Sequence, residues 1–237
     1  MKKAKVEFKN ITKKFNNTVA VNNVSCTFEP GTLTTLLGPS GCGKTTSLRI
    51  IAGLERATSG QILIDGEDVT ILPATERDVS MVFQSYALFP HMSVMENVSY
   101  GLRMINKNKE EYTEKTFNTL ELVGLKGYQD RMPSELSGGQ QQRVAVARAI
   151  VLEPKVLLFD EPLSNLDSKL RRQVREDIRF LQQSLSVTTI YVTHDQEEAL
   201  AISDNIIVMK NAVIAQQGGP RDLYNYPNNK FVANFIG

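Results

Sequence analysis

The sequence has little cysteine and no long hydrophobic run. Its two cysteines, Cys26 and Cys42, are too few for a disulfide framework, which favours a reducing, cytosolic compartment. No run of about 18 apolar residues occurs, so we expect no segment that spans a bilayer. The basic N-terminus leads directly into an alternating pattern at residues 6–9, without the apolar centre of a signal peptide. Any role at a membrane must therefore work through a partner.

The chain also lacks an excess of charge of one sign. The 27 Lys and Arg residues face 26 Asp and Glu residues, and the net charge is +1. A dedicated nucleic-acid binder is usually strongly basic, so we expect no nucleic-acid partner, although a local basic patch is still compatible with this total. With 41% hydrophobic and 22% charged residues, the composition is that of a globular protein. It excludes disorder, collagen-like repeats and a coiled coil.

Hydrophobic patterning predicts strands at both ends of the chain and helices in the middle. Segments 6–11 and 19–28 each have one polar face, which predicts antiparallel strands. Residues 61–64, closed by Asp65 and Gly66, are typical of half a hairpin. Short apolar strands are predicted at 32–37, 79–83, 156–159, 189–192 and 206–209; the last three are continuous apolar runs, as in parallel strands covered on both faces.

Helical periodicity is predicted from residue 44 to about 53 and again over about 94–152. Alternation of strands and helices implies a parallel sheet with right-handed crossovers. The predicted fold is therefore an α/β core interrupted by a helical insertion. A chain of 237 residues is long enough for one large domain of this kind or for two small ones.

Residues 38–45 fit the phosphate-loop pattern GxxxxGK(S/T), between a predicted strand and a predicted helix. Glycines let backbone N–H groups turn inward around phosphate oxygens, and the helix N-terminus adds its positive dipole end. We expect Lys44 to reach the β- and γ-phosphates and the Thr45 hydroxyl to bind Mg²⁺. The pattern recurs by chance in roughly one chain of this length per hundred, and the strand–loop–helix context makes it rarer. The predicted nucleotide-binding residues are Gly38, Pro39, Ser40, Gly41, Cys42, Gly43, Lys44, Thr45 and Thr46.

A second apolar strand ends in two carboxylates, Asp160 and Glu161. Open α/β sheets bind ligands at the carboxyl ends of their strands, so this pair is expected beside the phosphate loop. Asp160 would hold Mg²⁺ directly or through water. Glu161 would act as the general base that activates the attacking water. An ordinary strand ending in a solvated acidic turn is the simpler alternative, and the phosphate loop argues against it.

A phosphate loop alone does not separate the classes of nucleotide enzyme. Guanine-binding proteins need an Asn-Lys-x-Asp run, and the nearest candidate, residues 106–109, lacks the Asp; GTP is therefore disfavoured. The deciding string is residues 136–140, Leu-Ser-Gly-Gly-Gln, in which a hydroxyl and two glycines open a helix. By the physics of the phosphate loop, this string forms a second anion-binding element.

With this string, the chain resembles the ATP-binding subunit of an ATP-binding-cassette (ABC) transporter over essentially its whole length. The family's fold is a P-loop NTPase with a RecA-like parallel sheet, an N-terminal antiparallel β subdomain and a helical insertion. The resemblance implies one ABC ATP-binding domain over 1–237, with the RecA-like and β parts at 1–86 and 154–237 and the helical part at 87–153. ATP and Mg²⁺ are the implied ligands.

The resemblance also implies roles for individual residues. Phe15 would stack on adenine, where the alternative is a core aromatic at a strand end. His194 would contact the γ-phosphate and orient Glu161 as a second catalytic residue. Mg²⁺ would be held by Thr45, Gln84 and Asp160, and Gln84 would sense the transport subunit. Further implied nucleotide-binding residues are Ser137, Gly138, Gly139, Gln140 and Asp167. His91 matches no catalytic position and is expected at the surface near the subunit interface, and Cys42 is given no redox role.

In this family two cassettes pair head to tail, so that the signature string of one caps the ATP held by the phosphate loop of the other. The resemblance thus implies a homodimer with two ATP molecules at its seam, linked by Asp167 and its loop. The geometric alternative is that both anion sites grip one nucleotide within a monomer, which would require the helical insertion to fold back over the phosphates.

A free-standing cassette that serves separate membrane subunits fits the sequence best. DNA-repair relatives carry a long coiled coil between phosphate loop and signature, translation-associated relatives usually hold two cassettes, and exporters are often fused to membrane spans. Residues 84–92 resemble bacterial importers, in which their apolar and aromatic side chains would line the groove for a coupling helix; packing inside the domain is the alternative for Leu88 and Phe89.

The whole resemblance implies an ATPase peripheral on the cytoplasmic face of a bacterial inner membrane. Its partners would be two membrane permease subunits and, indirectly, a periplasmic substrate-binding protein.

The run 170–185 and residues 188–195 resemble most the ferric-iron branch, which also has members carrying sugar phosphates. Sulfate, polyamine and sugar importers are further alternatives. A soluble cassette ATPase acting on nucleic acid or ribosomes is the alternative from another class, and intact Glu161 and His194 argue against an inactive cassette. Importers of this branch usually continue past a segment like 231–237 into a β-rich regulatory domain, which is not in this sequence.

Overall fold

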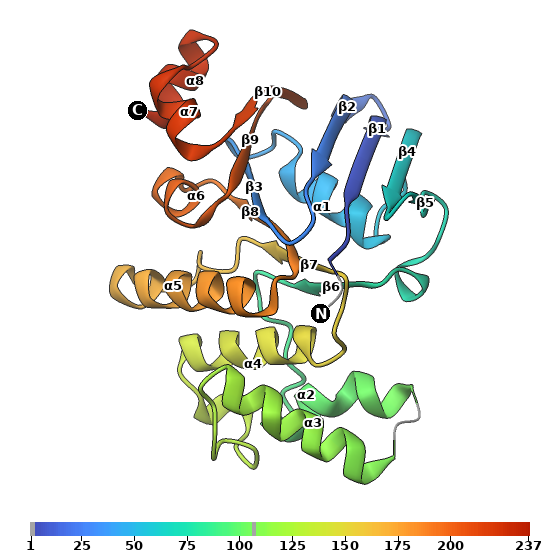
Figure 1. Ribbon diagram of the computed structural model, residues 1–237, viewed down its shortest axis with the longest axis vertical. Helices are drawn as coiled ribbons and strands as arrows, with labels where there is room; N and C mark the ends of the chain where they lie inside the picture. The colour runs from blue at the N-terminus through green and yellow to red at the C-terminus, as the bar shows by residue number, and fades with distance from the viewer. Residues whose placement is uncertain (1–2, 106–107) are drawn as a thin grey trace.

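The computed structural model of the protein describes residues 3–105 and 108–237. Asn106 and Lys107, half of the stretch compared above with a guanine motif, lie outside these residues. Two sheets organise the chain (Figure 1). The smaller, of order β2-β1-β4-β5, is antiparallel, with β1 at Val6–Phe15, β2 at Thr18–Phe28, β4 at Ser59–Ile64 and β5 at Glu67–Asp68.

The larger sheet has the order β10-β9-β3-β8-β7-β6. Its strands are β3 at Leu33–Leu37, β6 at Val79–Val82, β7 at Val156–Asp160, β8 at Thr188–Thr193, β9 at Asn205–Lys210 and β10 at Val213–Gly218. All neighbouring pairs from β9 to β6 are parallel, and β10 pairs antiparallel with β9 at the edge. The predicted parallel sheet and the predicted antiparallel N-terminal strands are confirmed.

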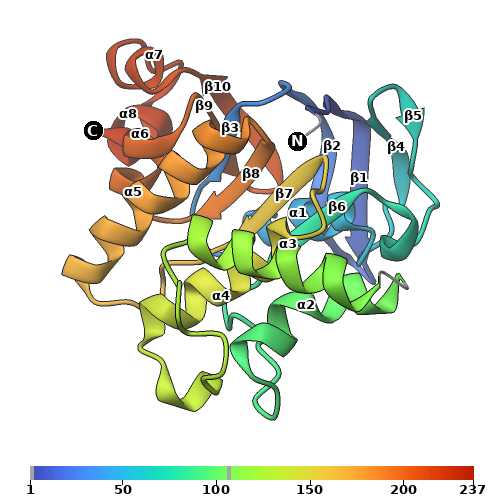
Figure 2. The same ribbon diagram turned by 60° about the horizontal axis from the view of Figure 1, so that its bottom comes forward.

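Helices cover both faces of the larger sheet. They are α1 at Lys44–Ala52, α2 at Val94–Met104, α3 at Lys109–Leu122, α4 at Gly138–Ile150, α5 at Ser168–Leu185, α6 at Gln196–Ile202, α7 at Pro220–Asn225 and α8 at Lys230–Ile236. Short 3₁₀ turns lie at Ala74–Glu76 and Pro133–Glu135. In Figures 1 and 2 the helices α2, α3 and α4 form one group, beside α5 and away from the antiparallel sheet. The helical periodicity predicted over 94–152 is therefore confirmed, whereas the limits of the helical part at 87–153 stay a prediction.

Alternating side chains of the parallel strands divide the core in two. Leu158 and Ile190 pack with α1 and the antiparallel sheet, on one face. Phe159 and Tyr191, the next residues along the same strands, pack with α4 and α5 on the other face. This burial on both sides explains why these strands are continuous apolar runs. In the part of the chain that the structure describes, no helix is both long enough and apolar enough to cross a bilayer.

Candidate nucleotide site

Four neighbouring parallel strands carry the predicted site residues at their carboxyl ends. The phosphate loop follows β3, His194 follows β8, Asp160 and Glu161 lie at the end of β7, and Gln84 follows β6. Because the sheet order is β3-β8-β7-β6, these four strand ends are adjacent. A parallel sheet thus gathers at one edge residues that lie more than 150 positions apart in the sequence. This edge is where open α/β sheets bind ligands.

The phosphate loop needs its glycines for space. A Cβ added to Gly38 would lie 2.4 Å from the carbonyl oxygen of Met209, and one added to Gly43 would lie 2.3 Å from that of Ala20. Gly43 also has a φ of +105°, a conformation that L side chains rarely adopt. The loop is therefore packed against the backbone of β2 and β9, which fixes its shape. Pro39, Ser40 and Gly41 lie exposed at the tip of the loop, and Thr46 is half-buried in α1.

Lys44 begins α1 with a side chain that is only 4% exposed. Its Nζ donates hydrogen bonds to the carbonyl oxygens of Gly38 at 2.7 Å and Pro39 at 2.9 Å, so the cation closes the loop on itself. The next residue, Thr45, donates its hydroxyl to Asp160 Oδ1 at 2.9 Å. This bond brings together two of the three side chains that the sequence analysis assigns to Mg²⁺.

Asp160 lies in a partly desolvated position. Burial raises the pKa of its carboxyl, and this effect outweighs the Thr45 hydrogen bond and the nearby Arg49 and Lys44 charges, which lower it. An additional cation beside this carboxylate would oppose the cost of burial. Oxygen ligands from a hydroxyl and a carboxylate are those that Mg²⁺ prefers, so Thr45 and Asp160 fit this ion.

Glu161 and His194 form the second pair of the site. Glu161 Oε2 lies 3.0 Å from His194 Nδ1, and the two side chains reach each other from the ends of β7 and β8. The Glu161 backbone has a φ of +45°, and its N–H donates to the carbonyl oxygen of Val192 at 3.0 Å. A left-handed glutamate is unusual, and the hydrogen bond to the neighbouring strand holds it there.

Gln84 connects to the same loop from β6. Its Nε2 donates to Ser164 Oγ at 3.1 Å, and the Ser164 hydroxyl donates to the carbonyl oxygen of Glu161 at 3.0 Å. In return, Asn165 Nδ2 donates to the carbonyl oxygen of Gln84 at 3.0 Å. A movement of Gln84 would thus reach the backbone of Glu161 through a single side chain.

The signature string opens α4 with an exposed N-terminus. Ser137 is the N-cap, and it exchanges hydrogen bonds with Gln140 in a capping box: Gln140 N–H donates to Ser137 Oγ at 3.4 Å and Ser137 N–H to Gln140 Oε1 at 2.9 Å. Added Cβ atoms at Gly138 and Gly139 would meet Leu166 at 3.2 Å and Leu170 at 2.9 Å. The signature therefore packs on the loop that carries Asp167, itself the exposed N-cap of α5.

Phe15 ends β1 and is 44% exposed, so the alternative of a core aromatic is wrong. Lys13 Nζ lies 4.6 Å from the centre of its ring, and Glu55 holds that ammonium at 2.6 Å. An exposed aromatic face is what stacking on a base requires.

Residues 84–92 depart in part from the expected groove. Tyr86 is buried in the core, so the interpretation that its side chain lines a docking groove is wrong. Leu88 is partly buried against the same core. Ala87 and Phe89, together with Tyr100, line a cavity of about 430 Å³.

Two residues that were given no role in the site are placed as follows. His91 is exposed, as predicted. Cys42 is buried, and desolvation raises the pKa of its thiol.

Sequence patterns missed a charged pair behind His194. Glu198 in α6 is 4% exposed and accepts hydrogen bonds from Thr193 Oγ1 at 2.8 Å and the Tyr191 hydroxyl at 3.2 Å. Arg171 in α5 lies 4.0 Å from Glu198 and donates to the carbonyl oxygen of Leu166 at 3.1 Å. The pair joins the His194 turn to the loop before Asp167. The sequence held one signal for this position: Glu198 follows Asp195 by three residues, the spacing of a helix N-cap and its partner.

A family profile described as ABC transporter matches residues 21–164. The chain belongs to the ABC transporter family. The "Fe(3+) ions import ATP-binding protein FbpC" of Brucella abortus (strain 2308) is 66% identical to this cassette over 232 residues, which are 98% of this chain and 66% of that protein. The cassette therefore spans about two thirds of the length of this relative.

Solved structures of other cassettes share the fold. The structure of cbiO1 from Clostridium perfringens, part of the cbiONQ ABC transporter complex, has a TM-score of 0.85 at 30% identity and covers 92% of this chain and 89% of its own. A bacterial ABC transporter cassette solved as a dimer has a TM-score of 0.80 at 31% identity, over 91% of this chain and 99% of its own. The predicted α/β fold and the predicted family are confirmed.

Proposed function

We propose that this cassette is the ATP-hydrolysing subunit of an importer, and that the cargo is ferric iron. The proposal depends above all on the Glu161–His194 pair, 3.0 Å apart at the ends of the neighbouring strands β7 and β8, of which β8 pairs with the strand that leads into the phosphate loop. A chain that only bound nucleotide would not need a carboxylate and an imidazole paired at this edge. The family and the name of the Brucella relative support the same activity.

The chain's own residues account for the steps of hydrolysis. The backbone N–H groups of the phosphate loop and Lys44 bind the β- and γ-phosphates, which requires Nζ to exchange the carbonyls of Gly38 and Pro39 for phosphate oxygens. Thr45 and Asp160 would hold Mg²⁺, with Gln84 completing the shell; the ion would neutralise charge that develops on the phosphates. Phe15 would stack on adenine.

Glu161 is the general base in this proposal. Its Oε2 is held by His194 Nδ1, so Oε1 is left to accept a proton from the attacking water. His194 is 56% exposed through its side chain, and its Nε2 is directed by the same contact to serve the γ-phosphate. The carboxylate thus removes the proton while the imidazole orients the base.

A head-to-tail homodimer would complete each site. Ser137 and Asp167 are exposed N-caps, and their helices begin side by side on the packed loop 164–167. The N-terminus of α4, with Gly138, Gly139 and Gln140, suits the γ-phosphate of an ATP held by a second cassette. Asp167 would then link the two sites across the seam.

Membrane permease subunits would dock on the cavity beside Phe89. Arg148 donates hydrogen bonds to the carbonyl oxygens of Tyr86 at 2.9 Å and Ala87 at 2.7 Å, which fixes the left-handed turn at these two residues. Asn97, fully buried, donates to the Phe89 carbonyl at 3.1 Å and accepts from its N–H at 2.9 Å. A partly apolar cavity lined by Ala87 and Phe89, which follow Gln84 closely in the sequence, suits a coupling helix. We infer from this that the cassette works at the cytoplasmic face of the inner membrane.

Ferric iron is proposed as the cargo from the Brucella relative, and a periplasmic binding protein would deliver it. Sugar phosphate, sulfate, polyamine or sugar import by the same machinery is the runner-up. The test is uptake of radioactive ferric iron by cells that lack the gene and carry wild-type, Lys44→Ala or Glu161→Gln copies. We expect uptake with wild type only. Equal uptake in all three strains would contradict the cargo, and ATPase stimulation by DNA or ribosomes instead of permeases would favour the soluble class.

A further inference from the structure

Lys13 lies against the aromatic ring near the end of β1. Its Nζ lies over the Phe15 ring, 4.6 Å from the ring centre. The Lys13 side chain is only 12% exposed, whereas Phe15 is 44% exposed. The lysine therefore covers one face of the ring, and the exposed surface of Phe15 lies on the other face and the ring edge. That free face is the one on which a base can stack.

The ammonium of Lys13 is itself held by the segment that follows α1. Its Nζ lies 2.6 Å from Glu55 Oε1 and donates a hydrogen bond to the carbonyl oxygen of Arg56 at 2.9 Å. The backbone beside Lys13 is tied to the same segment, because Thr58 N–H donates to the carbonyl oxygen of Thr12 at 2.7 Å. These contacts fix the position of the cation, and the cation in turn restrains the ring.

The strand turn that carries the ring packs on the phosphate loop. Phe15 pairs with Thr18 where β1 turns into β2, and two residues further along β2 the carbonyl oxygen of Ala20 lies against Gly43. From Gly43 the chain enters α1 and then reaches Glu55. The ring and the phosphate loop are thus joined twice, through β2 before α1 and through Lys13 and Glu55 after it.

We propose that Lys13 is a positioning residue for the base of the nucleotide, and that its ammonium holds the Phe15 ring in the orientation in which adenine stacks. The proposal rests on the stacking role of Phe15 proposed above. Without the cation, the exposed ring populates several rotamers, and only the fraction in the stacking orientation binds the base. The cation also offsets the negative charge of the ring face, which lessens the repulsion between two stacked π systems.

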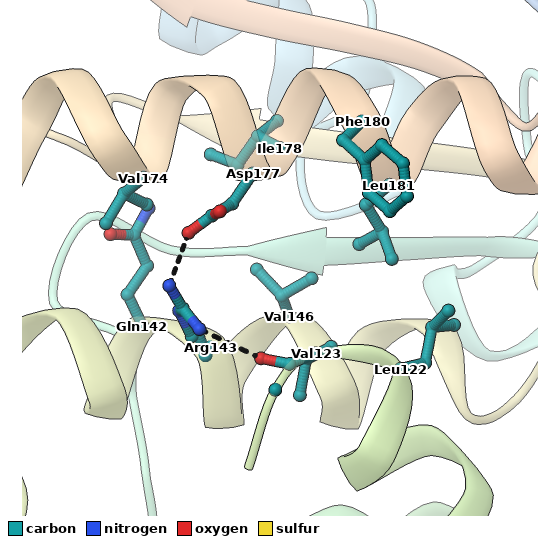
Figure 3. A pocket seen from close by; sticks show the side chains of 11 residues that line it. Leu122, Val123, Gln142, Arg143, Val146, Val174, Asp177, Ile178, Phe180 and Leu181 are labelled. Carbon is teal, nitrogen blue, oxygen red and sulfur yellow. Dashed lines mark hydrogen bonds and ion pairs between the residues drawn. The ribbon is translucent and has the colours of Figure 1, made fainter.

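An ion pair of the same length elsewhere provides a control for simple stabilisation. Arg143 Nη2 of α4 lies 2.6 Å from Asp177 Oδ2 of α5, at the rim of a cavity of about 220 Å³ (Figure 3). This pair joins two helices to each other. Glu55→Gln and Asp177→Asn therefore each remove a carboxylate from a 2.6 Å ion pair, but only Glu55 is linked through Lys13 to Phe15.

Calorimetric titration of the full chain with Mg-ADP and with Mg-pyrophosphate tests the role of Lys13. Lys13→Met keeps the apolar stem and removes the ammonium. A cation–π contact at an exposed site corresponds to a factor of about two to five, so ADP affinity should fall by about this factor. Pyrophosphate affinity should stay unchanged, because pyrophosphate has no base. Lys14→Met, at the exposed neighbouring position, should bind both ligands as wild type does.

A double-mutant cycle with Phe15→Leu shows whether Lys13 acts through the ring. Phe15→Leu should weaken ADP binding, and Lys13→Met should cause no further loss in this background. Glu55→Gln should weaken ADP binding, whereas Asp177→Asn should leave ADP affinity unchanged even where both lower the melting temperature. In ATPase assays, Lys13→Met should raise the KM for ATP and leave kcat unchanged, because the base contact is the same in the ground state and the transition state.

Three results would overturn the proposal: an unchanged ADP affinity in Lys13→Met, an equal loss of pyrophosphate affinity, or a loss that persists in the Phe15→Leu background. Equal ADP affinities of Glu55→Gln and Asp177→Asn would overturn the part assigned to Glu55. An unchanged ADP affinity in Phe15→Leu would overturn the stacking role of Phe15 and that of Lys13 with it. If wild type binds ADP but hydrolyses no ATP, the proposed function fails while the binding results stand, so the two failures are distinguishable.

Discussion

At the scale of single residues, Glu198 is a carboxylate buried beneath the turn that carries His194. Burial raises its pKa, and hydrogen bonds from Thr193 and Tyr191 only partly oppose this. An acid whose pKa is higher in the folded state stabilises the fold below its unfolded pKa, about 4.3, and that stability is lost as pH rises through the folded value. Above the folded pKa, the charged form of Glu198 is therefore a cost.

Glu198→Gln removes this cost and its pH dependence. We expect the free energy of unfolding of Glu198→Gln, relative to wild type, to increase as pH rises from about 4.3 through the folded pKa, because only wild type must bury a charge. Urea unfolding of both proteins over this pH range measures the difference. A difference that stays flat or falls with rising pH would contradict the account.

Gly43 and Gly41 provide a second prediction at this scale. Both have positive φ, but an added Cβ meets the Ala20 carbonyl oxygen at 2.3 Å only at Gly43, whereas at Gly41 no atom of the described chain lies within 4 Å. Gly41→Ala should cost about 1–2 kcal/mol, the strain of a left-handed alanine, and keep ATP affinity. Gly43→Ala should cost more and weaken ATP binding, because the loop must move. Unfolding measurements and calorimetry test this. Equal losses of unfolding free energy and of ATP affinity in the two variants would argue against the close packing of Gly43 on the Ala20 carbonyl oxygen.

At the scale of elements, the turn 86–89 has one side chain in the core, Tyr86, and one that faces a cavity, Phe89. Phe89→Ala should leave the melting temperature close to wild type and uncouple ATP hydrolysis from the permeases, since Phe89 faces the cavity. Tyr86→Ala is the matched variant, and it should lower stability by about 3–5 kcal/mol as a buried aromatic. Thermal unfolding and permease-stimulated ATPase rates check both; normal coupling in Phe89→Ala would contradict the docking role.

Elements with strong local patterns were predictable from the sequence. The apolar runs at β7, β8 and β9, and the phosphate loop between β3 and α1, follow from residue type and spacing alone. Strand β10 was missed because its residues are mostly half-exposed at a sheet edge, and α6 to α8 because helices of six or seven residues show barely two turns of periodicity.

Contacts between distant elements were beyond prediction. Arg171 and Glu198 belong to α5 and α6, and only the packing of these helices brings them together. The same holds for Tyr86, which the sequence analysis assigned to a docking groove although it lies in the core with residues of α2, α3 and α4. By contrast, the shared edge of Lys44, Asp160 and Glu161 was predictable because each lies after or at the end of a strand that the sequence shows. His194 was assigned from the family resemblance.

At the scale of the whole molecule, the sheet order brings the reacting groups to one edge, while the signature faces outward on another layer. The account therefore requires a second cassette to complete the site. The loop 164–167 lies against both the edge of the sheet and the signature. Ser164 contacts Gln84 at the sheet edge, and Leu166 lies beside Gly138 of the signature. Hydrolysis at Glu161 and separation of the two cassettes are expected to be coupled.

The mass of Glu161→Gln in solution, measured by size-exclusion chromatography with light scattering, tests this claim most directly. Glutamine keeps the shape of the side chain but accepts no proton, so hydrolysis should slow by about 10²–10⁴-fold while Lys44, Thr45 and Asp160 still bind Mg-ATP. The account predicts a dimer with Mg-ATP, a monomer without it, and a monomer again when Ser137→Arg is added at the exposed signature. A Glu161→Gln protein that stays monomeric at saturating Mg-ATP, or a dimer that survives Ser137→Arg, would contradict it.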